Sequence, residues 1–223
     1  MNNRTRLIKV SALAVLLVAC RADAEQATPS EGERLLHHFV SDVQTMSGRF
    51  EQQLVDANDN LVEEANGTLS ISKPGRFRWS YSEPYEQILI ADGLNIWSYD
   101  VDLAQVTVKP QQELLGSTPA ALLGGGGDVL DDFDYIGSST DRGTVWVRLQ
   151  PKSADNGFTR VELGFNDGTL RRLIFADNLE QTTLIALFDV DVNSAIAEDV
   201  FRFSPPADAD LVGVPISPES ADL

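Results

Sequence analysis

Apolar residues alternate with polar ones in a long series of short runs, and this period of two limits the fold more than any other feature of the chain. The runs extend from Ser47 to Phe203, with a break at 111–132, and pairs such as Asp92-Gly93 and Asp167-Gly168 separate them. A period of two puts every second side chain on one face of a β-strand, and Asp-Gly between two runs is a strong hairpin signal. The sequence predicts roughly nine to eleven short antiparallel strands in one curved or barrel-like sheet.

The positions of the expected strands predict which side chains share a face. Leu69 and Ile71 share a face of one run, and Phe77, Trp79 and Tyr81 share a face of the next. The runs cover residues 47–54, 66–73, 76–81, 87–91, 94–99, 105–109, 144–150, 159–165, 170–176, 183–192 and 200–203. In the run 183–192 the residues predicted to point inward are Leu184, Ala186, Phe188, Val190 and Val192.

Two segments read as helices. Ser30 with Glu33 is a capping-box signature, and apolar residues at helical spacing follow it, so the pattern predicts an amphipathic helix over 31–46. Within the break, Ser117-Thr118-Pro119 precedes a short apolar segment, 120–123, that four glycines at 124–127 cut off. A short apolar helix that ends in a glycine hinge is a candidate for a movable lid.

Residues 1–24 read as a signal peptide. Basic residues precede an apolar run of ten, from Val10 to Ala19, and Ala22-Asp23-Ala24 forms an A-x-A cleavage site. The run is shorter than the roughly 20 residues that span a bilayer. Cleavage before Cys20, in a segment that resembles a lipobox, is the alternative and would leave a lipidated N-terminus. We favour cleavage after Ala24 and expect one domain over 25–206, followed by a disordered tail over 207–223.

Charge and cysteine content exclude several classes of function. Removal of residues 1–24 takes away four Lys/Arg and one Asp, which leaves 13 basic and 33 acidic side chains and a net charge of −20. Such a charge disfavours binding to nucleic acid or to anionic membrane surfaces. Cys20 is the single cysteine, so a chain cut after Ala24 has neither a disulfide nor a thiolate.

The inventory of reactive residues predicts no enzyme, no metal site and no cofactor. His37 and His38 are adjacent on the expected helix and point in different directions, so they cannot chelate one metal together. No serine lies in a G-x-S-x-G motif, and Gly124–Gly127 lacks the following Lys-Ser/Thr of a phosphate loop. The aromatic strand residues are either the ordinary core of a sheet packed on the N-terminal helix or the wall of an apolar cavity.

Several stretches resemble the outer-membrane lipoprotein carrier protein family, LolA. The most specific is Lys73-Pro74-Gly75-Arg76-Phe77-Arg78-Trp79 within the run 67–81. The other matching stretches are 47–52, 90–93, 97–100, 105–109, 118–123 and 201–206, so the resemblance covers about residues 31–206.

The resemblance implies an unclosed antiparallel β-barrel, or half-barrel, covered by a lid of short α-helices. It implies a periplasmic chaperone, expected to be a monomer, that binds the acyl chains of lipoproteins. An inner-membrane ABC transporter would release these lipoproteins to it, and an outer-membrane receptor would accept them. No reaction is catalysed and no cofactor is used in such a role.

The resemblance also implies roles for individual residues. Lys73, just before a proline, takes the place of the family's basic latch, which holds the lid shut; the best-known members carry Arg there. Ala120 and Ala121 are smaller than the lid residues that the family leads us to expect. The residues expected to line the acyl-chain cavity are Phe50, Leu69, Ile71, Phe77, Trp79, Tyr81, Ile90, Trp97, Leu122 and Leu123.

Three other functions are compatible with the sequence. The outer-membrane receptor of the same pathway shares the fold and is itself a lipoprotein, which Cys20 would suit. A periplasmic sensor could bind lipid as a signal on this scaffold. A carboxylate-dependent hydrolase is the least favoured, because no pair of carboxylates stands out. The site of cleavage, the release of lipoproteins from membranes and the turnover of lipid esters distinguish these alternatives from the carrier.

Overall fold

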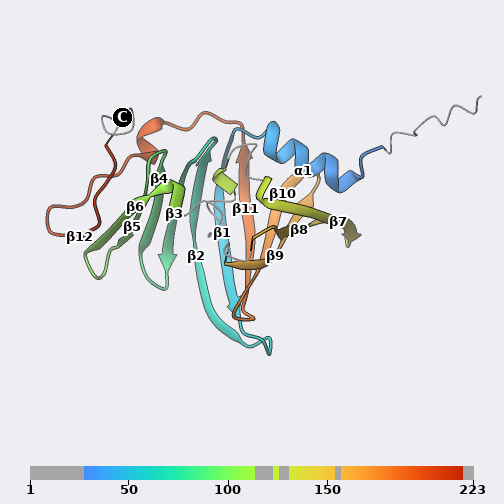
Figure 1. Ribbon diagram of the computed structural model, residues 1–223, viewed down its shortest axis with the longest axis horizontal. Coiled ribbons are helices and arrows are strands. Elements are labelled where there is room, and N and C mark those ends of the chain that lie inside the picture. The colour runs from blue at the N-terminus through green and yellow to red at the C-terminus, as the bar shows by residue number, and fades with distance from the viewer. Residues whose placement is uncertain (1–27, 114–122, 126–130, 154–156, 218–223) are drawn as a thin grey trace, which may run out of the picture.

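The computed structural model describes residues 28–113, 123–125, 131–153 and 157–217 (Figure 1). The expected signal peptide with both of its cleavage sites, most of the expected lid segment including Leu122, and residues 218–223 lie outside the described residues.

The described part forms one sheet of twelve strands, in the order β12-β6-β5-β4-β3-β2-β1-β11-β10-β9-β8-β7 (Figure 1). Neighbouring strands are antiparallel, except that β12 pairs with β6 in parallel. The sheet curls, but β7 and β12 remain its two edges, so the predicted unclosed barrel is confirmed. The strands are β1 (Thr45–Val55), β2 (Leu61–Ser72), β3 (Arg76–Glu83), β4 (Gln87–Asp92), β5 (Asn95–Asp100), β6 (Gln105–Pro110), β7 (Phe133–Asp141), β8 (Thr144–Pro151), β9 (Phe158–Asn166), β10 (Thr169–Asp177), β11 (Thr182–Val192) and β12 (Asp210–Val212).

The curl brings the apolar faces of both halves of the sheet together. Side chains from β1 to β5 and from β7 to β11 form a single buried cluster on this inner face, with α1 (Glu31–Ser41) packed against it. Burial of apolar area at about 25 cal/mol per Å² is the main force that closes the half-barrel. The strand members are Met46, Phe50, Leu69, Ile71, Phe77, Trp79, Ala91, Ile96, Phe133, Val147, Leu149, Val161, Leu163, Phe165, Leu170, Leu173, Phe175, Ile185 and Leu187.

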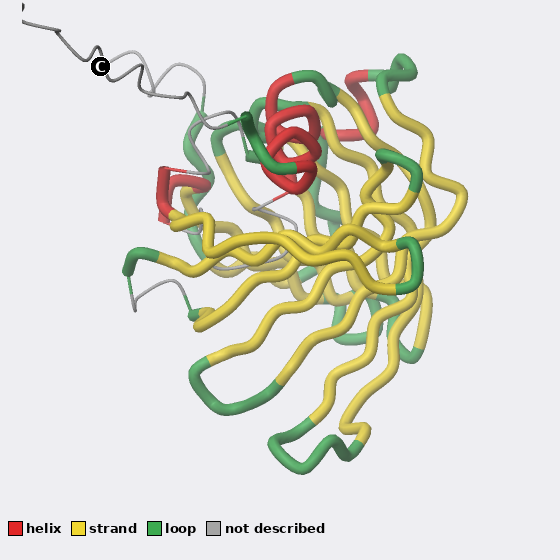
Figure 2. The backbone as a smooth tube through the Cα atoms, turned by 90° about the vertical axis from the view of Figure 1, so that its right-hand side faces the viewer, coloured by secondary structure: helices red, strands yellow, loops and turns green. Residues whose placement is uncertain are grey.

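Helix α1 lies across one end of the half-barrel and contacts β7 and β8 (Figures 1 and 2). The predicted capping box is present: Ser30 Oγ accepts from Glu33 N at 3.2 Å, and Glu33 Oε2 accepts from Ser30 N at 2.6 Å. Gly32 allows close packing, because a Cβ there would lie 2.3 Å from Ser138 Cβ. The helix ends at Ser41 rather than continuing to 46, and Met46 belongs to β1.

The predicted facing is wrong for Leu184, Ala186 and Phe188, whereas Val190 packs against the inner cluster as predicted. Ile185 and Leu187 are buried in the inner cluster, whereas Phe188 is 36% exposed and Val192 is 38% exposed. Pairing with β1 shifts register near Asp189, which has a φ of 50°. A β-bulge of this kind adds one residue to a strand, so Leu187 before it and Val190 beyond it both face the inner cluster, which alternation alone does not reveal.

The C-terminal region also departs from expectation. The predicted strand at 200–203 is instead a 3-10 turn, η4 (Glu198–Phe201), and β7 was not predicted at all. The expected disorder from 207 onward is wrong for residues 207–217, because Asp210–Val212 form β12 beside β6. Asn95 holds the segment beyond β12: its Nδ2 donates to Ile216 O at 2.9 Å, and its Oδ1 accepts from Ile216 N at 2.7 Å.

Replacement of Asn95 by Ala removes both of these hydrogen bonds, each of which contributes about 1 kcal/mol. We expect residues 213–217 of Asn95→Ala to be cleaved faster in limited proteolysis, while the inner core keeps its protection from hydrogen exchange. Asn166→Ala, which changes an asparagine at the other end of the sheet, is the control and leaves the C-terminal segment protected. Equal proteolysis of Asn95→Ala and the wild type would contradict this anchoring role.

Candidate functional site

The inner face brings together most of the predicted cavity residues. Six of them, Phe50, Leu69, Ile71, Phe77, Trp79 and Leu123, are at most 2% exposed in the inner cluster, and Tyr81 packs against it. Strand register explains this arrangement, since Trp79 pairs with Leu69 and Tyr81 pairs with Gly67, which in turn pairs with Phe50. In this structure the inner face is therefore filled by its own side chains.

Three aromatic rings form the centre of the first half of this face. The ring centroid of Phe50 lies 4.7 Å from that of Trp79 and 5.2 Å from that of Tyr81. Tyr81 Oη donates to Gln52 Oε1 at 3.4 Å. Burial raises the pKa of Tyr81 to about 12, although the hydrogen bond to Gln52 acts in the opposite direction. The phenol stays neutral at physiological pH and acts as a polar end to an otherwise apolar surface.

Only the last part of the expected lid is described, and it is packed against the core. Leu123 is fully buried, and Gly124 O accepts a hydrogen bond from Gly75 N at 2.7 Å. A Cβ at Gly124 would lie 3.1 Å from Phe77 Cδ1, so the glycine lets this segment lie directly on the Phe77 ring. Leu122, Ala120 and Ala121, which the sequence assigned to the same lid, lie outside the described residues.

Ile90 and Trp97 do not line the inner face, and this part of the prediction is wrong. They form a separate outer-face cluster with Val106 and Val108. Ile90 pairs with Arg78, one residue out of phase with Trp79, so it points to the opposite side of the sheet. The C-terminal segment covers this cluster, with the Phe203 ring 5.5 Å from that of Trp97.

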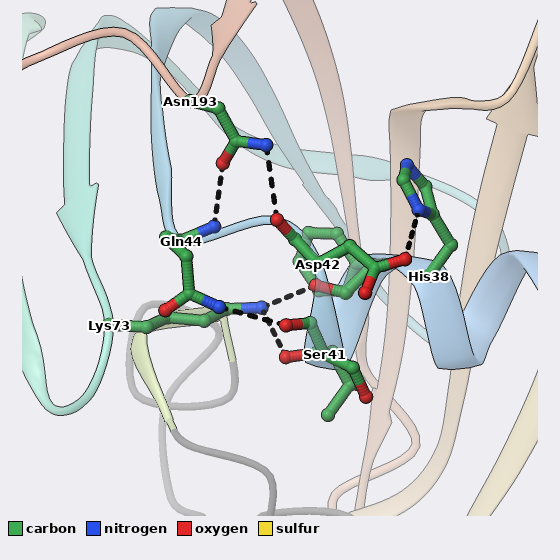
Figure 3. Close-up of polar contacts among 8 residues, drawn as sticks. His38, Ser41, Asp42, Gln44, Lys73 and Asn193 are labelled. Carbon is green, nitrogen blue, oxygen red and sulfur yellow. Dashed lines mark hydrogen bonds and ion pairs between the residues drawn. The ribbon is translucent and has the colours of Figure 1, made fainter.

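Lys73 lies where β2 ends and reaches the last turn of α1 (Figure 3). Its Nζ donates to Phe39 O at 2.5 Å and to Val40 O at 3.5 Å, and it lies 4.1 Å from the centroid of the Phe39 ring. The last carbonyls of a helix have no partner within the helix and carry partial negative charge, so a cation there stabilises the helix end. The structure thus shows a basic residue that fastens a covering helix to the sheet.

Two polar side chains complete this fastening, and together with Lys73 we call them the helix clasp (Figure 3). Gln44 Nε2 donates to Ser41 O at 2.8 Å, and Asn193 Nδ2 donates to Asp42 O at 3.0 Å. Asn193 Oδ1 also accepts from Gln44 N at 2.8 Å. The clasp joins α1 to both β2 and the end of β11, and it occupies the carbonyls that would have continued the helix.

The sequence predicted Lys73 as a latch on the lid segment, whereas the structure shows it bound to α1, and it predicted no role for Gln44 or Asn193. Nothing in the alternation of β-strand residues singles them out, because both lie just outside regular elements. Asn193 has a φ of 60°, a left-handed conformation that asparagine tolerates better than most residues, and this preference is the one local signal for it.

The free-energy cost of burying the Lys73 ammonium offsets part of the stabilisation that the clasp provides. Burial lowers the pKa of Lys73 from 10.5 to about 8. The side chain therefore remains mostly charged near neutral pH, but its charge is less favourable here than in water. A latch of this kind holds the helix with a small net free energy.

Two open grooves, of about 1140 and 530 Å³, flank the end of the sheet away from α1, near the tips of β1 and β2. Gln52 lines both grooves, and Tyr81 lines the smaller one. Within the described residues there is no group of three or more His, Cys, Asp or Glu side chains that could hold a metal ion. No helix in that same part of the chain is long and apolar enough to cross a membrane.

Replacement of Lys73 by Leu leaves the carbonyls of Phe39 and Val40 without their charged donor, a loss of about 1–3 kcal/mol locally. We expect the amides of α1 to exchange hydrogen at least tenfold faster in Lys73→Leu, while β9 and β10 are unaffected. Lys109→Leu removes an exposed lysine from β6 and serves as the control. If α1 exchanges at the same rate in Lys73→Leu and Lys109→Leu, Lys73 does not latch the helix.

The pKa of Lys73 also predicts a pH dependence. Between about pH 8 and 10.5 the unfolded chain binds a proton at Lys73 that the folded chain has lost, so this residue adds stability as the pH rises through that window. We expect the free energy of unfolding of the wild type, relative to Lys73→Met, to rise on the order of 1 kcal/mol across it, after allowance for partial exposure. Urea titrations of both proteins measure the difference, and a constant or falling value would contradict the lowered pKa.

The comparisons with known proteins agree with this geometry. The family model described as "Outer membrane lipoprotein carrier protein LolA" matches residues 41–204. The outer-membrane lipoprotein carrier protein of Nitrosomonas europaea is 36% identical over 209 residues, which cover 93% of this chain and 98% of that protein. The protein of the same name from Halorhodospira halophila is 38% identical over 208 residues, or 93% and 94% of the two chains.

Among solved structures, an uncharacterized conserved protein from Thermus thermophilus has a TM-score of 0.50 and 15% identity, and the match covers 82% of this chain and 96% of that one. This likeness supports the fold alone. The family model and the curated relatives each extend over most of the half-barrel. The chain therefore belongs to the outer-membrane lipoprotein carrier protein family, LolA.

Proposed function

We propose that this protein encloses the acyl chains of lipoproteins between its inner face and the cover formed by α1 and the Leu123 segment, and carries them across the periplasm. The observation that supports this most strongly is the apolar inner face, which is continuous across both halves of the sheet and has a helix fastened over it by a few polar contacts. The names of the relatives agree with this role.

Such a carrier must keep the hydrocarbon chains of its ligand out of water. Each CH₂ group removed from water stabilises the bound state by about 0.8 kcal/mol, so several acyl chains cannot cross an aqueous space uncovered. The inner face is already filled by residues such as Phe50 and Trp79, each 1% exposed, so chains can enter only when the cover moves. A weakly held cover lets binding shift the protein between a closed state and an open one.

The proposed roles of the residues follow their positions. Phe50, Leu69, Ile71, Phe77 and Trp79 would contact the acyl chains, with Tyr81 at the polar end and Leu123 from the cover. Lys73 would hold the closed state. Ile90 and Trp97 have no such role, since they lie on the outer face beneath the C-terminal segment.

The proposed partners are an inner-membrane ABC transporter that loads the carrier and an outer-membrane receptor that unloads it. The carrier itself would hydrolyse nothing, so the free energy for extraction would come from the transporter. The net charge of −20 that remains after removal of residues 1–24 would limit adhesion to anionic bilayers, which favours transfer by protein contacts over collision with membranes.

One observation favours a second candidate, the outer-membrane receptor of the same fold. Cys20 follows Leu17-Val18-Ala19, and cleavage before it would anchor the chain by lipid. Sequencing of the mature N-terminus separates the two functions: Glu25 as first residue agrees with the soluble carrier, and an acylated Cys20 agrees with the receptor.

The decisive test is a release assay. Purified protein that begins at Glu25 is added to inner-membrane vesicles that hold newly made lipoproteins, with ATP present. We expect lipoproteins to appear in the soluble fraction as a one-to-one complex, and to appear there only when the protein is added. Leu179→Ser, which changes an exposed loop side chain, is expected to release as much as the wild type. Lipoproteins that remain on the vesicles in every sample would contradict the carrier function.

A further inference from the structure

The indole N–H of Trp79 is buried without a hydrogen-bond partner. Trp79 is 1% exposed, and its Nε1 finds no acceptor among the residues that the structure describes. Among the buried side-chain nitrogen and oxygen atoms of that part of the chain, it is alone in this respect. Trp97, by contrast, donates from Nε1 to Asp92 Oδ2 at 2.7 Å. A buried donor without an acceptor is costly, so its presence calls for a physical reason.

The surroundings of Trp79 place this donor at the boundary between apolar and polar parts of the inner face. Its ring stacks on Phe50, and the next inner-face residue of β3 is Tyr81, whose hydroxyl bonds to Gln52. The Trp79 indole acts on the Tyr81 hydroxyl as a weak hydrogen-bond donor and so lowers its pKa, but the contact falls short of the geometry of a full hydrogen bond.

A groove open to solvent reaches Gln52 and Tyr81, the polar neighbours of Trp79. The groove of about 530 Å³ is lined by Gln52, Ala65 and Tyr81 on its inner side and by the exposed Tyr85 and Leu103 further out. Gln52 pairs with Ala65, one inner-face step beyond the pairing of Phe50 with Gly67. Going inward from solvent, the side chains therefore change from the exposed groove wall to Gln52 and Tyr81, then to Trp79, and then to the apolar core.

We propose that Trp79 donates its indole N–H to an acyl carbonyl oxygen of the bound lipid, with Tyr81 and Gln52 beside it as a polar step. This inference rests on the proposed function and deepens it, because it fixes how the lipid lies. The hydrocarbon chains enter the space beneath α1, the carbonyls stop at Trp79, and the peptide leaves through the 530 Å³ groove.

The carbonyl groups of the ligand need a hydrogen-bond donor where they are buried. An acylated cysteine carries ester and amide carbonyls between its hydrocarbon chains and its peptide, and burial of a carbonyl without a donor is unfavourable. A donor fixed in an apolar wall satisfies one carbonyl without raising the polarity of the whole cavity. The indole N–H of a tryptophan can only donate, so it matches a carbonyl oxygen, which only accepts, and it does not match a donor such as an ammonium group.

The test compares matched lipopeptides on the wild type and on Trp79→Phe. The first lipopeptide has two ester-linked chains on the glyceryl group and an N-acyl chain. The second replaces both esters by ethers, and the third keeps the esters but has a free amino terminus. We expect Trp79→Phe to bind the first lipopeptide roughly fivefold more weakly than the wild type does. With the lipopeptide that lacks the contacted carbonyl, we expect the two proteins to have the same affinity to within about twofold. Loss of the penalty with the ether analogue identifies an ester carbonyl, and loss with the free amine identifies the amide.

Two controls separate hydrogen bonding from a change of shape. Replacement of Trp79 by β-(3-benzothienyl)alanine keeps the bicyclic ring with sulfur in place of the N–H, and it is expected to reproduce the selective penalty even if Trp79→Phe folds poorly. Trp97→Phe, on the outer face, is expected to bind all three lipopeptides as the wild type does. An equal penalty for all three lipopeptides in the benzothienyl protein, or no penalty for any, would overturn the proposal, whereas a wild type that binds none of them would refute the carrier function itself.

Discussion

The contact between the Lys73 ammonium and the last carbonyls of α1 is the constraint on which the closed structure depends. A sheet curled into an unclosed barrel leaves an apolar inner face that something must cover, and α1 covers one end of it. The helix can end there only if its free carbonyls find donors. Lys73, Gln44 and Asn193 supply them from two distant parts of the sheet, so the residues that end the helix also fasten it over the inner face.

The covers over the two faces of the sheet are held by different kinds of contact. The outer-face cluster is covered by the C-terminal segment, which is held by the Phe203 ring and by two hydrogen bonds between the Asn95 side chain and the Ile216 backbone. The inner face is covered by a helix whose clasp includes a partly buried charge with its pKa lowered to about 8. Aromatic stacking and neutral hydrogen bonds carry no such penalty. The two covers thus differ in kind: ring contacts and neutral hydrogen bonds hold the outer one, and a partly buried charge helps to hold the inner one.

The sequence was informative where a residue's role followed from local periodicity. Alternation placed Phe50, Leu69, Phe77 and Trp79 on one face, and the structure places them together. Alternation cannot tell which of two apolar faces is the inner one, and for this reason Ile90 and Trp97 were assigned to the wrong side. Nor can it detect the bulge near Asp189, which depends on a backbone conformation and changes the facing of the residues beyond it in β11.

The roles of residues outside the repeating pattern were harder to predict from the sequence. Asn193 and Gln44 acquire their roles only when the end of β11 meets the end of α1, a contact between segments 149 residues apart. Strand β12 has just three residues and takes its register from β6, so its own composition gave little sign of order. Such features depend on long-range pairing, and a local pattern carries no information about it.

Lysine rather than arginine at position 73 has a physical consequence for the closed state. A compact ammonium can contact Phe39 O, Val40 O and the Phe39 ring from one point, whereas a planar guanidinium presents its donors in a fixed fork. An arginine would also remain charged, and so carry the cost of desolvation, at every accessible pH. Lys73 can release its proton when the surroundings become alkaline, and the buried neutral amine then no longer opposes closure. Part of the strength of this contact therefore depends on a titratable group, and the folded state gains stability from it as the pH rises from about 8 to 10.5.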